Sequence, residues 1–178
     1  IGFGREYEEK EQSQMSLIYA FLISVALVYM IMASQFESLL QPFIIMMTVP
    51  LSIIGVGFTL YFTGTSVNAM SMLGVIILAG VVVSNGIILI DFVNQLRGEG
   101  QPIREALINA GGTRLRPILI TNTSGVLGLV PMAMQWEEGS EFQAPMAVAV
   151  IGGQIVSMCL TLFIIPAIYQ VVETFLLF

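Results

Sequence analysis

Apolar residues occur along this chain in long runs, not in the period-3.6 or period-2 patterns of a soluble helix or strand. A bilayer core of about 30 Å needs roughly 20 helical residues to cross it. The runs therefore predict five membrane-spanning helices, at about residues 15–33, 42–62, 69–90, 117–134 and 145–172. We expect an all-α integral membrane helical bundle over residues 15–178, preceded by a polar helical lead-in over residues 1–14.

Proline positions agree with these boundaries. Pro42, Pro117 and Pro145 each stand at a predicted helix start, where the missing N–H does no harm. Pro50 lies inside the second predicted span, so we expect that helix to kink unless a neighbour compensates.

The segment between the third and fourth spans has a pattern of its own. Pro102 is expected to open a short helix, which the glycine pair 111–112 ends. The apolar residues Ile103, Leu107 and Ala110 fall on one face of it. This pattern predicts a small amphipathic helix lying at the membrane interface.

The cationic residues predict the orientation of the bundle. The chain has six Lys and Arg, and four of them lie between the third and fourth spans: Arg97, Arg104, Arg114 and Arg116. Short cytoplasmic loops of membrane proteins are enriched in Lys and Arg, so this segment is predicted to be cytoplasmic. The lead-in, the turn at residues 63–68 and the connection between the fourth and fifth spans are then external.

Composition excludes several classes of function. Hydrophobic residues make up 56% of the 178, and charged residues 10%, whereas a soluble domain has about a quarter charged. The net charge of −6 argues against nucleic-acid binding, which requires a basic surface. The chain has no His and a single Cys, Cys159, so we expect no disulfide, no metal centre and no cofactor. We do not expect an enzyme, because the spans hold no paired carboxylates and the chain has no Gly-x-Gly-Asp motif.

Polar residues inside the apolar runs are the candidate functional residues. The third span carries Ser84 and Asn85 and meets the cytoplasm near Asp91, while the first half of the fourth carries Thr121, Asn122 and Ser124. These two spans run in opposite directions, so their polar parts lie at similar depth on the cytoplasmic side. We expect the amides and hydroxyls to meet across one helix–helix contact.

Each candidate also has a simpler interpretation. A Ser or Thr hydroxyl can bond to the carbonyl four residues earlier in its own helix. An Asn amide can serve only to join two helices, at roughly 0.6 kcal/mol per hydrogen bond. Asp91 can be a solvated interfacial carboxylate, or the partner of an Arg, or a proton-accessible group at the inner mouth of a pathway. The sequence leaves these alternatives open.

Glycines predict where the helices pack closely. They recur in the third, fourth and fifth spans, at Gly74, Gly80, Gly86, Gly125, Gly128, Gly152 and Gly153. Small residues let helix backbones approach each other in membranes. We therefore expect a core formed by the third, fourth and fifth spans, with the first two more exposed to lipid.

Several motifs, in order, resemble the second membrane half of resistance-nodulation-division (RND) efflux transporters. They are residues 33–43 (ASQFESLLQPF) with 48–51 (TVPL), residues 80–92 (GVVVSNGIILIDF), residues 114–121 (RLRPILIT) with 128–131 (GLVP), and the last span with Gly152, Gly153 and Pro166. The resemblance covers about residues 5–178 and is closest to the hydrophobe/amphiphile exporters.

The resemblance implies a twelve-helix inner-membrane protein with two six-helix halves, each carrying a large extracytoplasmic insert after its first helix. This chain would be the last five helices, preceded by the tail of the second insert, which fits an excerpt that begins with Ile1 instead of Met. Implied partners are the N-terminal half and the extracytoplasmic domains of the same protein, further copies in a homotrimer, a periplasmic adaptor, an outer-membrane channel and the bilayer. Proton influx would drive export of drugs, detergents, bile salts or fatty acids.

The resemblance also implies roles for individual residues. In the family, paired carboxylates of the first half face a Lys in the helix matching the third span, and a hydroxyl in the next helix completes a proton relay. Here Ser84 stands at the Lys position, Asn85 matches and Thr121 stands at the hydroxyl position. Without the Lys, either Asn85 and Thr121 serve as hydrogen-bonding partners in a simpler relay, or coupling differs. Two further alternatives are the related membrane module of protein-secretion accessory proteins and a non-transport structural bundle.

Overall fold

The computed structural model describes residues 2–136 and 138–176, and this part of the chain is all-α. The helices are α1 (Gly2–Phe36), α2 (Leu40–Met46), α3 (Thr48–Thr63), α4 (Ala69–Gly98), α5 (Ile103–Ala133) and α6 (Ala144–Leu176), with a short 3₁₀ turn, η1 (Ser140–Phe142). The predicted lead-in and the first predicted span form one continuous helix, α1.

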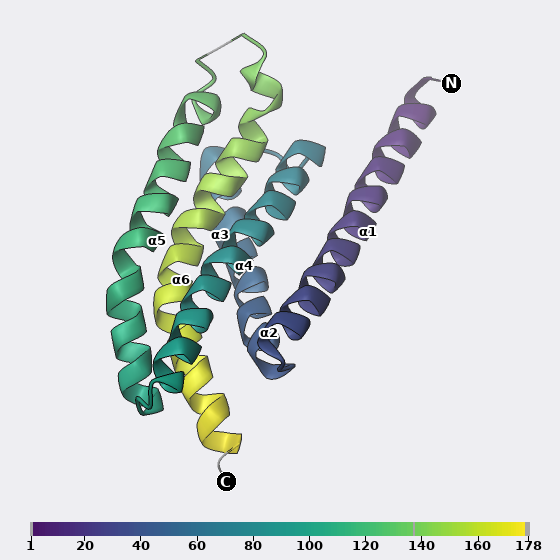
Figure 1. The fold of residues 1–178 in the computed structure, drawn as a ribbon. Coiled ribbons are helices and arrows are strands. Elements are labelled where there is room, and N and C mark those ends of the chain that lie inside the picture. The colour runs from purple at the N-terminus through teal and green to yellow at the C-terminus, as the bar shows by residue number, and fades with distance from the viewer. Residues whose placement is uncertain (1, 137, 177–178) are drawn as a thin grey trace.

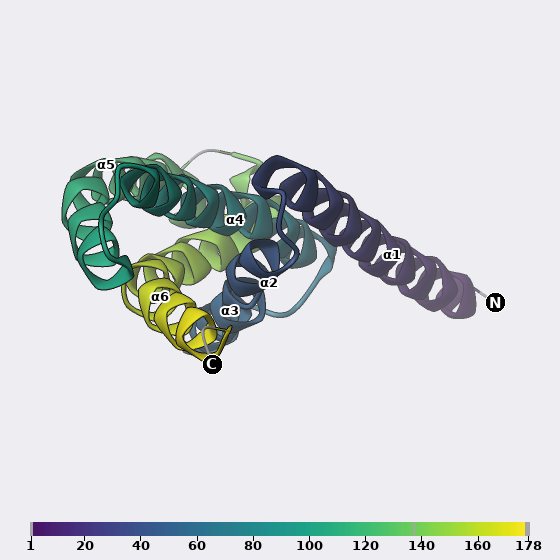
Figure 2. The same ribbon diagram turned by 60° about the horizontal axis from the view of Figure 1, so that its bottom comes forward.

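Helix α6 is the centre of the bundle and packs against α3, α4 and α5. Helix α1 leaves the bundle at the α2 end and extends away from it, as both views show (Figure 1, Figure 2). Only 6% of the apolar stretch of α1 is buried within the chain, against 50% of that of α4. The prediction that the first span lies at the periphery is therefore confirmed.

Four helical stretches of the described residues are long and apolar enough to cross a membrane: Glu11–Phe36, Leu40–Thr63, Ala69–Gly98 and Ala144–Val172. The fourth predicted span, 117–134, lies in α5, which is long enough but is not among them. The polar run from Thr121 to Ser124 and the glycines that follow lower its hydropathy. Length and composition thus confirm four of the five predicted spans.

The second predicted span is broken into two helices. Helix α2 ends at Met46, and α3 begins at Thr48, two residues before Pro50. A proline ring clashes with the carbonyl four residues earlier and donates no hydrogen bond to it. For Pro50 that carbonyl belongs to Met46, so the predicted kink is observed as a break one turn before the proline.

Helix α5 corrects two predictions. It runs without interruption from Ile103 to Ala133, so the glycine pair 111–112 does not end a helix and Pro117 does not begin one. The face predicted to lie on the membrane interface instead packs against the bundle, where Leu107 and Ala110 are buried. Burial of this face stabilises a helix that glycine and proline propensities alone would interrupt.

The close contact between α3 and α6 corrects a third prediction, that the second span is mainly exposed to lipid. A Cβ atom placed on Gly152 would overlap the Thr59 side chain, and one placed on Gly55 would lie 2.6 Å from Val156 Cβ. The two helices therefore approach each other where a glycine of one helix lies against a side chain of the other, as small residues allow in membranes.

A polar network joins α2, α4 and α6 at the end of the bundle near Gly98. Gln41 and Asn94 exchange two amide hydrogen bonds of 3.1 and 2.8 Å. The Tyr169 hydroxyl donates to Asn94 Oδ1 at 3.3 Å and accepts from Arg97 Nη1 at 3.1 Å. Tyr169 is buried, so this network fixes α6 to the short helix α2 through α4.

We expect Tyr169→Phe to lower the free energy of unfolding by about 1–2 kcal/mol, because it removes one bond given and one accepted by a buried hydroxyl. Equilibrium unfolding in mixed micelles measures this loss. Tyr61→Phe is the matched control, since Tyr61 is 82% exposed. Equal losses in the two variants would show that the network contributes nothing to stability.

Candidate functional site

The candidate site is a buried cluster of three carboxamides, contributed by α4, α5 and α6. Asn85 of α4, Asn122 of α5 and Gln154 of α6 are 6%, 1% and 4% exposed. We refer to these three residues as the amide junction. A polar group in the interior of an apolar bundle is costly without hydrogen bonds, so the partners of each amide matter.

Asn122 is the acceptor at the centre of the amide junction. Asn85 Nδ2 donates to Asn122 Oδ1 at 3.1 Å, and Gln154 Nε2 donates to the same oxygen at 3.1 Å. A carbonyl oxygen has two lone pairs, and both are used. The predicted contact between Asn85 and Asn122 is therefore confirmed.

The junction is incompletely satisfied. Asn122 Nδ2 is buried and has no hydrogen-bond partner among the residues that the structure describes. An unpaired buried donor costs about 1–3 kcal/mol. This cost falls at the point where three helices meet.

Gln154 was not predicted as a site residue. The available signal was an amide in the middle of the apolar stretch Ala144–Val172, directly after the glycine pair 152–153. The glycine pair predicted close helix packing at this point of the span. It did not indicate that Gln154 lies on the side of α6 that faces α5.

Ser84 and Asp91 do not belong to the junction. Both are exposed within this chain, and they lie seven residues apart, so together with Ile88 they form one stripe on the outside of α4. Ser84 is adjacent to Asn85 in sequence, but about 100° around the helix from it.

Thr121 and Ser124 are also exposed, on α5, so the prediction that they share the Asn85–Asn122 contact is wrong. The Thr121 hydroxyl donates to the carbonyl oxygen of Pro117 at 3.0 Å, four residues earlier. This is the simpler interpretation that hydroxyls in helices allow. The candidate residues thus divide into a buried pair, Asn85 and Asn122, and an exposed set on the outer faces of α4 and α5.

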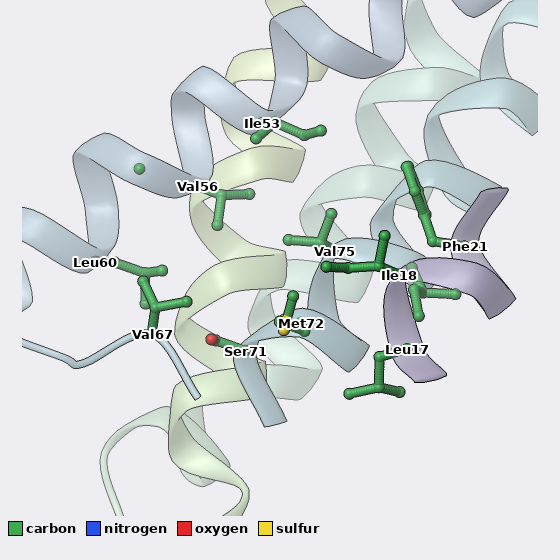
Figure 3. Close-up of a pocket in the computed structure, with 12 residues that line it drawn as sticks. Leu17, Ile18, Phe21, Ile53, Val56, Leu60, Val67, Ser71, Met72 and Val75 are labelled. Carbon is green, nitrogen blue, oxygen red and sulfur yellow. The ribbon is translucent and has the colours of Figure 1, made fainter. Parts of the chain in front are cut away.

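An apolar groove separates α1 from α3 and α4. One part, of about 280 Å³, is lined by side chains such as Leu17, Phe21 and Val56 (Figure 3). Of the side chains labelled there only Ser71 carries an oxygen, and its hydroxyl already caps α4 through Asn68. A second part, of about 260 Å³, continues from Phe21 toward Ser84. The groove suits an apolar group, whereas polar recognition is concentrated at the amide junction and on the exposed stripe.

The match to known proteins decides the family. Residues 1–173 match the AcrB/AcrD/AcrF family. The chain belongs to that family. The resemblance to RND efflux transporters is thereby confirmed, and the AcrB/AcrD/AcrF proteins are membrane transporters, not enzymes.

Two curated AcrB/AcrD/AcrF relatives illustrate the similarity. The swarming motility protein SwrC of Bacillus subtilis (strain 168) is 41% identical over 157 residues, which are 88% of this chain and 15% of SwrC. The multidrug resistance protein MdtC of Erwinia amylovora is 34% identical over 160 residues, 89% of this chain and 16% of MdtC. The chain therefore spans about one sixth of the length of these relatives.

The fold is likewise that of part of an RND pump. A crystal structure of a heavy metal efflux pump superposes with a TM-score of 0.86 at 36% sequence identity. The match covers 94% of this chain and 17% of that protein. The arrangement of the helices around α6 is thus that of one segment of a much larger transporter.

Proposed function

We propose that this chain is part of the membrane domain of a proton-coupled RND transporter that exports drugs or other amphiphiles across the inner membrane. The observation that carries the proposal is the amide junction, which joins α4, α5 and α6. Its α4 member, Asn85, is next in sequence to Ser84 of the exposed polar stripe. In this proposal α5 crosses the bilayer as a fifth span despite its polar centre. The first turns of α1 lead in from an extracytoplasmic domain.

The exposed set is proposed to face the other membrane half of the same protein. Ser84 and Asp91 on α4 and Thr121 on α5 are polar groups at the surface of an apolar bundle, where lipid contact would be unfavourable. A carboxylate in the missing half would exchange hydrogen bonds with Ser84 and Thr121 as it gains and loses a proton. Extracytoplasmic domains, a homotrimer, a periplasmic adaptor and an outer-membrane channel complete the proposed assembly.

In this proposal, proton binding is coupled to export because the carboxylate of the missing half makes different contacts when it is protonated and when it is ionised. A proton on the missing carboxylate changes which groups on α4 and α5 it bonds, and so favours one arrangement of the two halves. The amide junction transmits a displacement of α4 to α5 and α6, because Asn122 Oδ1 of α5 accepts hydrogen bonds from both α4 and α6. Alternating access would then be a rocking of one half against the other.

We expect Thr121→Ala to lower pH-gradient-driven drug export and proton flux by about tenfold, a loss of about 1.4 kcal/mol in the transport barrier. Its hydroxyl bonds only its own helix and is exposed, so the amount of folded protein should not change. Drug resistance of cells and proton flux in vesicles measure the effect. Thr123→Ala, exposed on the same helix, is the control. Wild-type values of both readouts for Thr121→Ala would remove Thr121 from the relay.

A further inference from the structure

Gln154 is a polar side chain buried in the interior of the bundle. It is 4% exposed and belongs to the apolar stretch Ala144–Val172 of α6. Its amide nitrogen donates to Asn122 Oδ1 across the α5–α6 contact. An apolar residue of similar size would fill this position without needing a hydrogen-bond partner, whereas a buried amide costs free energy unless it is hydrogen-bonded.

Gly125 on α5 provides the space for this amide. A Cβ atom at Gly125 would lie 3.0 Å from Gln154 Nε2 and 3.4 Å from Gln154 Oε1. Gly125 is one turn beyond Asn122 on the same helix, so it lies beside the bond that Gln154 makes. The sequence of α5 thus supplies both the acceptor for Gln154 and the gap in which its amide lies.

The bonding pattern ties the orientation of Asn85 to that of Gln154. A pair of Asn side chains can hydrogen-bond in two ways, with either one as donor. Here a single atom, Asn122 Oδ1, faces both partners, so both must present a donor. With Gln154 in place, reversing this pair requires the Gln154 amide to turn as well, so Gln154 favours the arrangement in which Asn85 directs its N–H toward Asn122 and its carbonyl oxygen away from it. Without Gln154, Asn122 is free to turn its own Nδ2 toward Asn85, which reverses the polarity of the pair.

We propose that Gln154 is a positioning residue for transport: acting through Asn122, it fixes which face of the Asn85 amide is presented on α4, one residue from Ser84. This inference rests on the proposed proton-coupled function. Gln154 acts at a distance from the exposed stripe, because its contact is with Asn122 in the interior of the bundle. The polarity of Asn85 is then set by a helix, α6, that carries none of the relay candidates.

The test uses Gln154→Leu and Gln154→Glu in the complete transporter, reconstituted in lipid vesicles with an imposed pH gradient. A lumenal pH-sensitive dye reports proton influx and ethidium serves as the transported probe, each measured as a function of pH. Ser157→Ala is the matched control: Ser157 is equally buried on α6, but its hydroxyl donates to the Gln154 carbonyl within the same helix, at 3.0 Å.

Gln154→Leu is expected to lower both rates by about three- to twentyfold at every pH, the range spanned by single interhelical hydrogen bonds in membranes. Gln154→Glu is expected to be impaired at high pH, where a carboxylate only accepts, and to recover at low pH, where the protonated carboxyl group donates to Asn122 Oδ1 again. A merely structural role would make this recovery follow the amount of folded protein, so that amount is measured at each pH as well. Ser157→Ala should match the wild type.

Two results would overturn the inference. One is a Gln154→Leu transporter with wild-type rates and pH profile. The other is a parallel loss in both Gln154 variants that follows the amount of folded protein at every pH. A wild-type protein that moves no protons under the gradient would instead overturn the proposed function, so the two failures are distinguishable.

Discussion

Gly152→Ala is expected to destabilise the bundle by about 3 kcal/mol, the upper part of the usual range for overpacking. The added methyl group would overlap the Thr59 side chain, including its Cβ atom, which no change of rotamer can move away. The overlap can be relieved only by separating α3 from α6. Equilibrium unfolding of the purified protein in mixed micelles measures the loss.

The same site offers a control and a rescue for that prediction. Gly57 lies on α3, and a Cβ atom placed there would meet nothing within 4 Å, so Gly57→Ala should leave stability nearly unchanged. Combining Gly152→Ala with Thr59→Gly should restore much of the lost stability, because the overlapping atoms are gone. If the double variant is as unstable as the sum of the two single variants, the steric explanation is wrong.

Asn122→Leu is expected to lower the free energy of unfolding by about 1–3 kcal/mol. It removes the one oxygen that accepts from Asn85 and Gln154, and it leaves both of these donors buried. An unpaired buried donor costs about 1–3 kcal/mol. The substitution also removes the unpaired Asn122 Nδ2, which offsets about one such cost. Thr123→Leu, on an exposed face of the same helix, is the control and should be nearly neutral.

The triple variant Asn85→Leu, Asn122→Leu and Gln154→Leu separates hydrogen bonding from packing. Replacing all partners of a buried network by apolar groups can be nearly neutral, whereas removing one partner is costly. We therefore expect the triple variant to be more stable than Asn122→Leu alone, yet inactive in transport. A triple variant less stable than the single variant would show that the junction stabilises by shape and not by its bonds.

Particular residues show how far the sequence predicts the site. Asn85 and Asn122 were expected to meet because two antiparallel spans bring their polar parts to the same depth, and their hydrogen bond confirms this. Thr121 was grouped with them, but sequence proximity to Asn122 does not give its direction around the helix, and it lies on an exposed face. Gln154 was missed because the partner of an amide within an apolar helix depends on which faces of the helices pack together.

The sequence by itself determined the helices, four of the membrane spans, the family and the polar residues that interrupt the apolar runs. Run length and local motifs are properties of consecutive residues, so they need no knowledge of the fold. Only the tertiary structure decided that α6 is central, that α3 belongs to the core and that α5 continues through two glycines and a proline. A helix that is apolar on all sides gives no periodic indication of its partner face. The close fit of small residues such as Gly152 against Thr59, which exists only once the helices have packed, makes that choice.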